Sequence, residues 1–315
     1  MTLTQLGAFV LVARLGSVRA AADVLGVSEP AVSRALAALR QHMGDQLVVR
    51  DGNGMALTEG GSRLFSIASQ MVALGSDAEA AVRAGKGAPA QLRLLVTSTI
   101  AEFIATPLLE AFGKRWQGTF EASSGVATAA EMRVLLPNRL ADVALGPDLS
   151  GDPSLGLTSE PVLRYRIILV AAPHLRTTGS PSRWPWLVDP SGTDPNSDTG
   201  RLLRGFRVPE SAVRVFPNQT AAWAAAADGL GVAPAVATLV SPQLRRGELR
   251  AVDTELTPAE ARWYVTTLNP DRRSEAARYL RNFLSTPDTM QRRCSPGTGV
   301  APSRFRPPVY VTIWS

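Results

Sequence analysis

The amino-acid sequence predicts an α/β protein in three parts: a helix-turn-helix followed by a β-hairpin, one long helix, and a larger domain. Three observations support this prediction. A glycine separates two short helical patterns near the N-terminus. One apolar periodicity then runs through residues 58–85, and from residue 92 onward short β-prone runs alternate with helical segments, which is typical of a mainly parallel sheet.

The helix-turn-helix is centred on residues 28–36. A first helix is predicted from the apolar positions 6, 9, 10 and 13. A second apolar segment around Leu25 ends at Gly26, which readily takes the left-handed conformation that closes a helix. Ser28 is placed to cap the next helix by accepting a backbone hydrogen bond, and Pro30 suits the first turn of that helix. We expect this helix to bury Val32, Leu36 and Leu39.

The N-terminus of this helix presents short polar groups and an arginine, which suit a DNA major groove. The candidate DNA contacts on it are Ser28, Glu29, Pro30, Ser33 and Arg34. Apolar runs at 47–50 and 55–57 flank the turn residues 51–54 and predict a β-hairpin, or wing, on which Arg50 and Asn53 would contact phosphate or the minor groove. An ordinary helical hairpin with a solvated face, beside a surface hairpin without a partner, is the alternative.

Net charge does not by itself indicate DNA binding. The chain carries +6, but residues 1–60 hold five arginines and five acidic residues, a balance of zero. Binding must therefore depend on the placement of a few arginines and on two copies acting together.

Composition argues against several other classes. No apolar run approaches the roughly 20 residues that cross a bilayer, and no basic segment precedes the apolar start as in a secretion signal. The only cysteine is Cys294 and the only histidines are His42 and His174, so we expect no disulfide framework, metal site or cofactor, and a cytoplasmic location. Neither histidine has a nucleophile and an acid at local spacing, and no phosphate-binding loop is present, so we expect no enzymatic activity.

Residues 1–60 resemble the DNA-binding domain of the LysR-type transcriptional regulators. The matching positions are Phe9, Gly16, Ser17, Ala20 to Ala22, Leu25, Ser28, Pro30 to Ser33, Leu39, Gly44, Leu47, Arg50, Leu57, Thr58 and Gly61. Two positions depart from the family pattern: Glu29 stands where the family usually has glutamine, and Arg40 where it usually has glutamate. A carboxylate accepts a hydrogen bond from cytosine but repels phosphate, so the base preference expected of the family does not carry over to Glu29.

Thr58 is expected to cap a helix that ends near Gly85 and Gly87. At 1.5 Å per residue this helix would be about 40 Å long. Its apolar stripe needs a partner, which is either its own chain or a second subunit. The resemblance implies a dimerisation helix at residues 61–87, paired through Leu64, Met71 and Ala78, in a homodimer that assembles further into a homotetramer.

Residues 88–285 follow the linker at 85–89. Strands are predicted at 92–96, 119–122, 141–145, 213–216 and 232–233, helices at 102–115, 128–136 and 219–228, and extended runs between lobes at 162–163 and 167–172. Segments 140–144, 170–173 and 228–234 resemble the LysR effector domain, which implies a two-lobed, periplasmic-binding-protein-like fold that binds a small-molecule effector between its lobes.

Small molecules bind open α/β sheets at the carboxyl ends of strands, where helix N-termini offer free N–H groups. The residues at these positions, given the implied cleft, are Ser98, Thr99, Gly125, Thr128, Gly146, Gln219 and Thr220. Arg164, Arg201 or Glu102 would be able to reach inward. Taken alone, each polar residue is better explained as a helix cap than as a ligand contact, because Ser, Thr and Asn cap helices routinely.

The proline-rich tail at 286–315 departs from the family and is expected to be disordered. The sequence thus favours a LysR-type regulator that binds promoter DNA and responds to a small-molecule effector. The alternatives are a small-molecule sensing protein whose N-terminal helices serve only assembly and, with no support from the residues present, an enzyme on a binding-protein scaffold.

Overall fold

A computed structural model describes residues 1–51 and 54–284 of the protein. The chain forms two compact units. The N-terminal unit is Met1–Ala90 with Ala130–Ala141 and Ser154–Gly156, and the C-terminal unit is Gln91–Ala129, Asp142–Pro153 and the chain from Leu157 onward. The tail predicted at 286–315 lies outside the described residues. None of the described helices combines the length and apolar character needed to cross a membrane.

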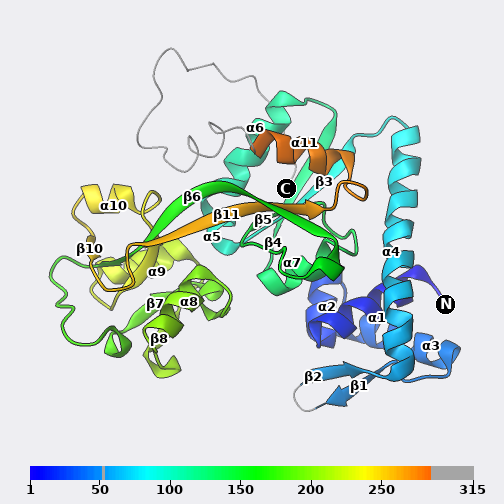
Figure 1. The fold of residues 1–315 in the computed structure, drawn as a ribbon, viewed down its shortest axis with the longest axis horizontal. Helices are drawn as coiled ribbons and strands as arrows, with labels where there is room; N and C mark the ends of the chain where they lie inside the picture. The colour runs from blue at the N-terminus through cyan, green and yellow to red at the C-terminus, as the bar shows by residue number, and fades with distance from the viewer. Residues whose placement is uncertain (52–53, 285–315) are drawn as a thin grey trace. The chain divides into compact units, whose positions relative to one another are not determined.

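The N-terminal unit has the predicted order of elements (Figure 1). They are α1 (Leu3–Leu15), α2 (Val18–Leu25), α3 (Glu29–Met43), β1 (Val48–Asp51), β2 (Gly54–Leu57) and α4 (Glu59–Gly85). The three-helix arrangement, the hairpin and the long helix are confirmed. The predicted cap of α4 is also confirmed, because the Gly61 N–H donates to Thr58 Oγ1 at 2.9 Å.

The core of the N-terminal unit is built around α1. Leu6, Phe9 and Leu11 are fully buried, and α1 contacts α2, α3 and α4. Phe9 meets the ring of Phe65 on α4 edge-on, with centroids 6.4 Å apart. Because α1 contacts both α3 and α4, it joins the helix-turn-helix to the base of the long helix.

The C-terminal unit alternates strands with helices, as predicted. Its described elements are β3 (Ala90–Val96), α5 (Ser98–Ile100), a π-helical turn (Ala101–Ala105), α6 (Thr106–Arg115), β4 (Phe120–Val126), β5 (Val143–Gly146), β6 (Leu157–Ala171), β7 (Trp186–Val188), α8 (Asp198–Gly205), β8 (Val213–Val215), α9 (Gln219–Ala227), β9 (Ala233–Val236), α10 (Ser241–Arg245), β10 (Arg250–Val252), β11 (Ala259–Leu268) and α11 (Glu275–Leu284). Helix α7 (Ala129–Leu135) lies between β4 and β5 in the chain but belongs, from Ala130 on, to the N-terminal unit. The helix predicted at 102–115 starts earlier, at Ser98, and the two extended runs at 162–163 and 167–172 belong to one strand, β6.

Two long strands, β6 and β11, connect the two lobes of this unit: the first lobe contains β3, β4, β5, α5, α6 and α11, and the second contains β7, β8, β9, β10 and helices α8, α9 and α10. The main sheet has the order β10-β6-β11-β5-β3-β4, and β9 also pairs with β6. Residues 157–167 of β6 pair with β11, whereas residues 167–171 pair with β9 and β10 of the second lobe. Figure 1 shows β6 (green) and β11 (orange) side by side. The second lobe also contains the parallel pair β7–β8.

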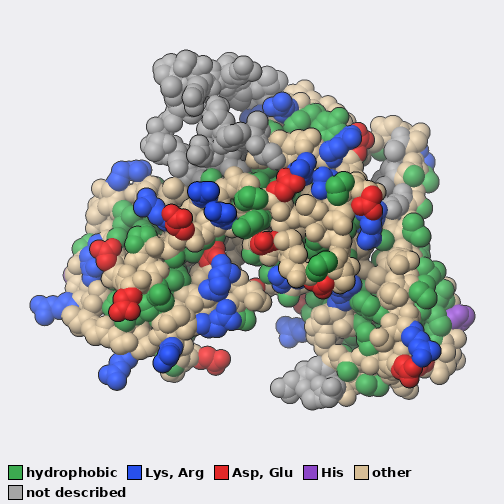
Figure 2. Space-filling view, viewed as in Figure 1, with side chains coloured by type: hydrophobic (Ala, Val, Ile, Leu, Met, Phe, Trp, Pro, Cys, Tyr) green, Lys and Arg blue, Asp and Glu red, His purple; other side chains and the backbone are tan. Residues whose placement is uncertain are grey.

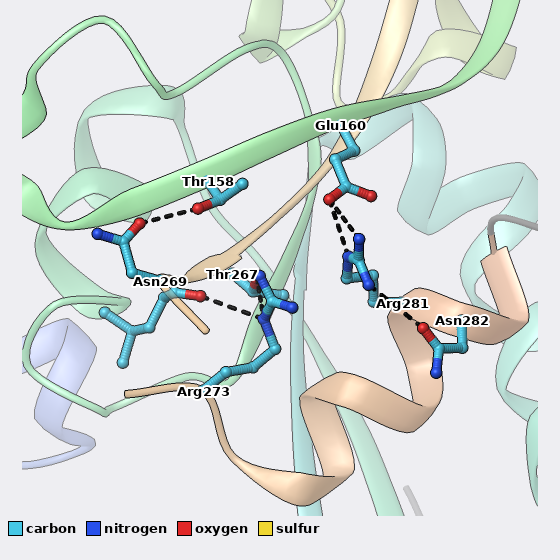
Figure 3. Close-up of polar contacts among 8 residues, drawn as sticks. Thr158, Glu160, Thr267, Asn269, Arg273, Arg281 and Asn282 are labelled. Atoms are coloured by element: carbon cyan, nitrogen blue, oxygen red, sulfur yellow. Dashed lines mark hydrogen bonds and ion pairs between the residues drawn. The ribbon is translucent and has the colours of Figure 1, made fainter. Parts of the chain in front are cut away.

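Helix α11 is fixed to the first lobe by polar contacts at the edge of the crossing strands (Figure 3). Arg281 donates to Glu160 on β6 at 2.5 Å and 2.9 Å. Arg273, which lies just before the helix, donates to Thr267 on β11 at 2.9 Å. The apolar face of α11, including Leu280 and Phe283, packs into the first-lobe core.

Candidate nucleic-acid interface and inter-lobe contacts

The side chains predicted to contact DNA on α3 are presented to solvent. Ser28, Glu29, Pro30, Ser33 and Arg34 are all exposed. The opposite stripe of α3 is buried, with Val32, Leu36 and Leu39 at most 2% exposed. Burial of this stripe fixes the helix to α1 and α2 and leaves its N-terminal polar face available to a partner.

The start of α3 differs from the prediction in one detail. Ser28 is the N-cap residue, with extended backbone angles, and Pro30 lies in the first turn as predicted. The Ser28 side chain, however, makes no capping hydrogen bond, so the predicted cap is wrong. Glu29 in the first turn supplies the favourable negative charge at this helix end instead. The Ser28 hydroxyl is therefore not committed to the helix backbone.

The wing forms as predicted. Strands β1 and β2 pair antiparallel, with Val48 opposite Leu57 and Arg50 opposite Met55. Arg50 is exposed. Asn53 lies outside the described residues.

Arg40 connects α3 to the wing, which sequence reasoning missed. Its guanidinium donates to the carbonyl oxygens of Gln46 at 2.7 Å and Val48 at 2.8 Å. The only signal in the sequence was that Arg40 departs from the family pattern. These two bonds set the position of β1 relative to the C-terminal end of α3.

Asp45 fixes the other side of the wing. Its carboxylate accepts hydrogen bonds from the Leu47 N–H at 2.6 Å and from the Thr58 hydroxyl at 2.7 Å. These two bonds, in that order, lower the pKa of Asp45. The first turn of α4 passes close by, and a Cβ on Gly61 would lie 1.9 Å from the Leu47 carbonyl oxygen. The junction between wing and long helix thus requires glycine at position 61.

Helix α4 carries exposed apolar side chains at steps of seven and eight residues. Ile67, Leu74 and Val82 are 57%, 66% and 59% exposed, and Figure 2 shows hydrophobic side chains (green) along this helix. Of the predicted dimerisation residues, Ala78 is exposed, whereas Leu64 and Met71 are half-buried. The most exposed apolar side chains therefore lie beside the predicted row.

The candidate effector residues of the first lobe lie at one edge of its sheet. Strands β3 and β5 run parallel and end at Val96 and Gly146, so their carboxyl ends are adjacent. The Ala127 N–H donates to the Val96 carbonyl at 2.9 Å, which brings the end of β4 to the same edge. Ser98 and Thr99, which begin α5, thus share this edge with the other three predicted residues, Gly125, Thr128 and Gly146.

The second-lobe candidates lie at the N-terminus of α9, whose free N–H groups were predicted to face a ligand. Asn218 caps this helix through Ala221. Gln219 is buried, and its side-chain amide donates to the Pro234 carbonyl at 2.7 Å, whereas Thr220 is exposed. The Gln219 side chain is thus held within its own lobe.

Two contacts join the candidate residues of the lobes. The Ser98 hydroxyl donates to the carboxylate of Asp189, which is buried. The Glu102 carboxylate accepts from the backbone N–H groups of Gln219 and Thr220, each at 3.0 Å. Three charged residues were expected to be able to reach into the cleft, and one of them, Glu102, forms hydrogen bonds to the other lobe. Of the other two, Arg201 forms an ion pair with Asp198 and Arg164 is exposed.

Within the described residues, no group of three or more His, Cys, Asp or Glu side chains is arranged to hold a metal ion. The candidate effector residues lie at strand and helix ends and carry hydrogen-bonding groups.

Comparison with known proteins identifies the family. Residues 3–62 match the model of the bacterial regulatory helix-turn-helix protein of the LysR family, and residues 85–286 match the LysR substrate binding domain. An uncharacterized HTH-type transcriptional regulator of Mycobacterium tuberculosis strain H37Rv is 36% identical, with both chains covered completely. The transcriptional regulator CfxR of Cupriavidus necator is 29% identical over 90% of this chain and 91% of CfxR.

Solved structures show the same fold. Full-length LysG of Corynebacterium glutamicum aligns with a TM-score of 0.52 at 22% identity, covering 92% of this chain and 98% of LysG. A variant of full-length AphB aligns with a TM-score of 0.59 at 19% identity, covering 91% and 99%. On the two family-model matches and the full-length relative, this chain belongs to the LysR family of transcriptional regulators, with a helix-turn-helix DNA-binding domain and a two-lobed effector-binding domain.

Proposed function

We propose that this regulator binds promoter DNA as a homodimer through the exposed N-terminal face of α3, with the wing contacting the flanking backbone. The observation that supports this most directly is the separation on α3 of a buried apolar stripe from the exposed residues Ser28, Glu29, Pro30, Ser33 and Arg34. Arg34 supplies the positive charge for phosphate or guanine, and Glu29 restricts the bases accepted. Arg50 and Asn53 are the proposed wing contacts.

The dimer would form through α4. The exposed Ile67, Leu74 and Val82 extend the row that contains Leu64, Met71 and Ala78, so the stripe has the spacing of a helix that pairs with another helix. Pairing would present two recognition helices to two half-sites, and further contacts would give a homotetramer. Acting on DNA, the protein would work in the cytoplasm.

The proposed effector site lies between the lobes, at Ser98, Thr99, Gly125, Thr128, Gly146, Gln219 and Thr220. A small molecule there would change the preferred arrangement of subunits only through its difference in affinity for the two arrangements. We divide the chain accordingly into a DNA-binding domain at 1–60, a dimerisation helix at 61–87, an effector domain at 88–285 and a tail at 286–315.

A band-shift titration against the DNA upstream of the protein's own gene tests the DNA-binding proposal. Arg34→Ala should weaken binding and lower the slope of log affinity against log salt by up to about 1.8, because each phosphate contact contributes about 0.9 and a dimer has two copies. Arg204→Ala, which removes an exposed arginine of α8, is the charge-matched control. Failure of the intact protein to bind at low salt would instead favour a sensing protein whose N-terminal helices serve assembly.

A further inference from the structure

One helical segment of the first lobe contacts the second lobe at successive turns. Helix α5, the π-helical turn and α6 form one helical run from Ser98 to Arg115. Ser98 lies at its start, and Glu102 and Phe103 lie within the π-helical turn. Single π-helical turns inside α-helices are frequently found at functional sites.

The contact made by Glu102 is specific in geometry and charge. Its two carboxylate oxygens each accept one of the first two N–H groups of α9, those of Gln219 and Thr220. These groups have no partner within a helix and lie at its positive end. The third N–H, of Ala221, is taken by Asn218. Glu102 therefore completes the N-terminus of a helix in the other lobe, 117 residues along the chain.

Two neighbouring contacts lie on the same boundary. The Phe103 ring stacks on Trp223 of α9, with centroids 5.3 Å apart and an interplanar angle of 20°. Phe103 packs against both the first-lobe core and a core cluster of the second lobe. At the start of the helical run, Ser98 donates to Asp189, which precedes the 3-10 turn Pro190–Thr193. Separation of the lobes at this boundary would break all three contacts.

We propose that Glu102 acts as a latch that holds the two lobes together without an effector. Lobes joined by two strands are able to move as rigid bodies around those strands, and a charged contact across the boundary then favours one arrangement. Effector binding would be coupled to keeping or breaking the latch. Only the coupling between effector binding and the latch rests on the proposed effector function. The Glu102 contact itself is present in the protein without any effector.

Hydrogen exchange of the full-length protein, without DNA or added ligand, tests the latch. Glu102→Ala should speed exchange of the Gln219 and Thr220 amides about 10- to 100-fold, because a hydrogen bond to a charged group is lost at each. If Glu102 holds the lobes, exchange should also rise in the remote turn Pro190–Thr193, where the Gly192 N–H donates to the Asp189 carbonyl. A merely local helix cap would change the α9 amides alone, and that result would overturn the proposal.

Chemical rescue and matched variants complete the test. Acetate, compared with chloride at the same ionic strength, should slow exchange again at the Gln219 and Thr220 amides of Glu102→Ala by supplying a carboxylate, but not in the turn Pro190–Thr193, because free acetate is not attached to the first lobe. Recovery at both places would contradict the proposal. Glu102→Gln keeps the side-chain shape and one acceptor oxygen, so it should accelerate amide exchange less than Glu102→Ala does. If Glu102→Ala also loosens the middle of α9, the exchange pattern of Glu102→Gln is the one that tests the latch. Glu110→Ala, an exposed glutamate of α6, should change nothing. Because no DNA is present, failure of the DNA-binding proposal would not alter these outcomes.

Discussion

The position of the wing depends on Arg40, and removing this side chain should loosen β1 while leaving α1 intact. Arg40→Ala eliminates the bonds to the Gln46 and Val48 carbonyls. Hydrogen bonds that involve a charged group contribute about 1.5–3 kcal/mol each when shielded from water. The bond to Gln46 is exposed and the bond to Val48 is partly buried, so we expect a combined loss of about 1–3 kcal/mol.

Native-state hydrogen exchange measures this loss locally. A loss of 1–3 kcal/mol should speed exchange of the wing amides about 5- to 150-fold. Amides of α1 serve as the internal reference, because their protection depends on the core. Arg40→Lys separates charge from geometry: lysine keeps the positive charge but lacks the forked donor, so it should recover only part of the protection.

Unchanged wing exchange in Arg40→Ala would refute this reasoning, since it would mean that strand pairing alone holds β1. Equal acceleration in the wing and in α1 would also refute it, because Arg40 would then support the whole unit. The expected pattern is confined to the wing. Band-shift affinity should fall in parallel, because Arg50 lies on the strand that Arg40 positions.

Three further variants test neighbouring features. Gly61→Ala places a Cβ 1.9 Å from the Leu47 carbonyl oxygen. Although alanine is the better helix former, this clash should lower the free energy of unfolding, measured by urea titration, by about 1–3 kcal/mol. An unchanged urea midpoint would contradict the close approach. The pKa of Asp45 is lowered in the folded protein, so its contribution to folding stability is present above the unfolded pKa of about 3.9 and is lost as pH falls through the folded value. The urea midpoint of Asp45→Asn should therefore differ most from that of the parent protein near neutral pH and least near pH 3. Leu74→Glu puts a charge on the exposed stripe of α4 and should shift the protein toward monomer in light scattering, whereas an unchanged mass would exclude α4 pairing at this position.

Elements whose residues interact locally were predicted best. The stripe of Val32, Leu36 and Leu39, the turn at Gly26 and the cap at Thr58 depend on spacings of three or four residues, and each is confirmed. The hairpin was predicted because turn residues lie between two short apolar runs. In all of these the pattern and the partner lie within a few residues of one another.

Strand β11 and helices α8 and α11 were not predicted, for physical reasons. The first half of β11 is rich in alanine, glutamate and arginine, which have low strand propensity, and it is a strand because it pairs with β6. Helix α8 is only eight residues long and contains two glycines. Tertiary pairing and packing overrode weak local preference in these segments.

The inter-lobe contacts could not be read from spacing either. Ser98 meets Asp189 across 91 residues and Glu102 meets Thr220 across 118. The sequence did indicate that the N-terminus of α9 would attract a partner. It did not indicate that the partner is a carboxylate of the same chain. On α4, periodicity identified the stripe, but only packing distinguishes the half-buried Leu64 and Met71 from the exposed Leu74.

The charge balance of the DNA-binding domain gives Glu29 a particular role. A carboxylate in the first turn stabilises α3 through the helix dipole by about 0.3–1 kcal/mol, but at the DNA surface it repels phosphate. With five arginines balanced by five acidic residues in 1–60, attraction between the domain and DNA of arbitrary sequence is weak. At the proposed interface, we therefore expect tight binding only where Arg34 and its neighbours find matching groups and Glu29 meets a donor such as the cytosine amino group. We expect such a domain to gain specificity from unfavourable contacts at wrong sites and to reach tight binding when two copies bind together.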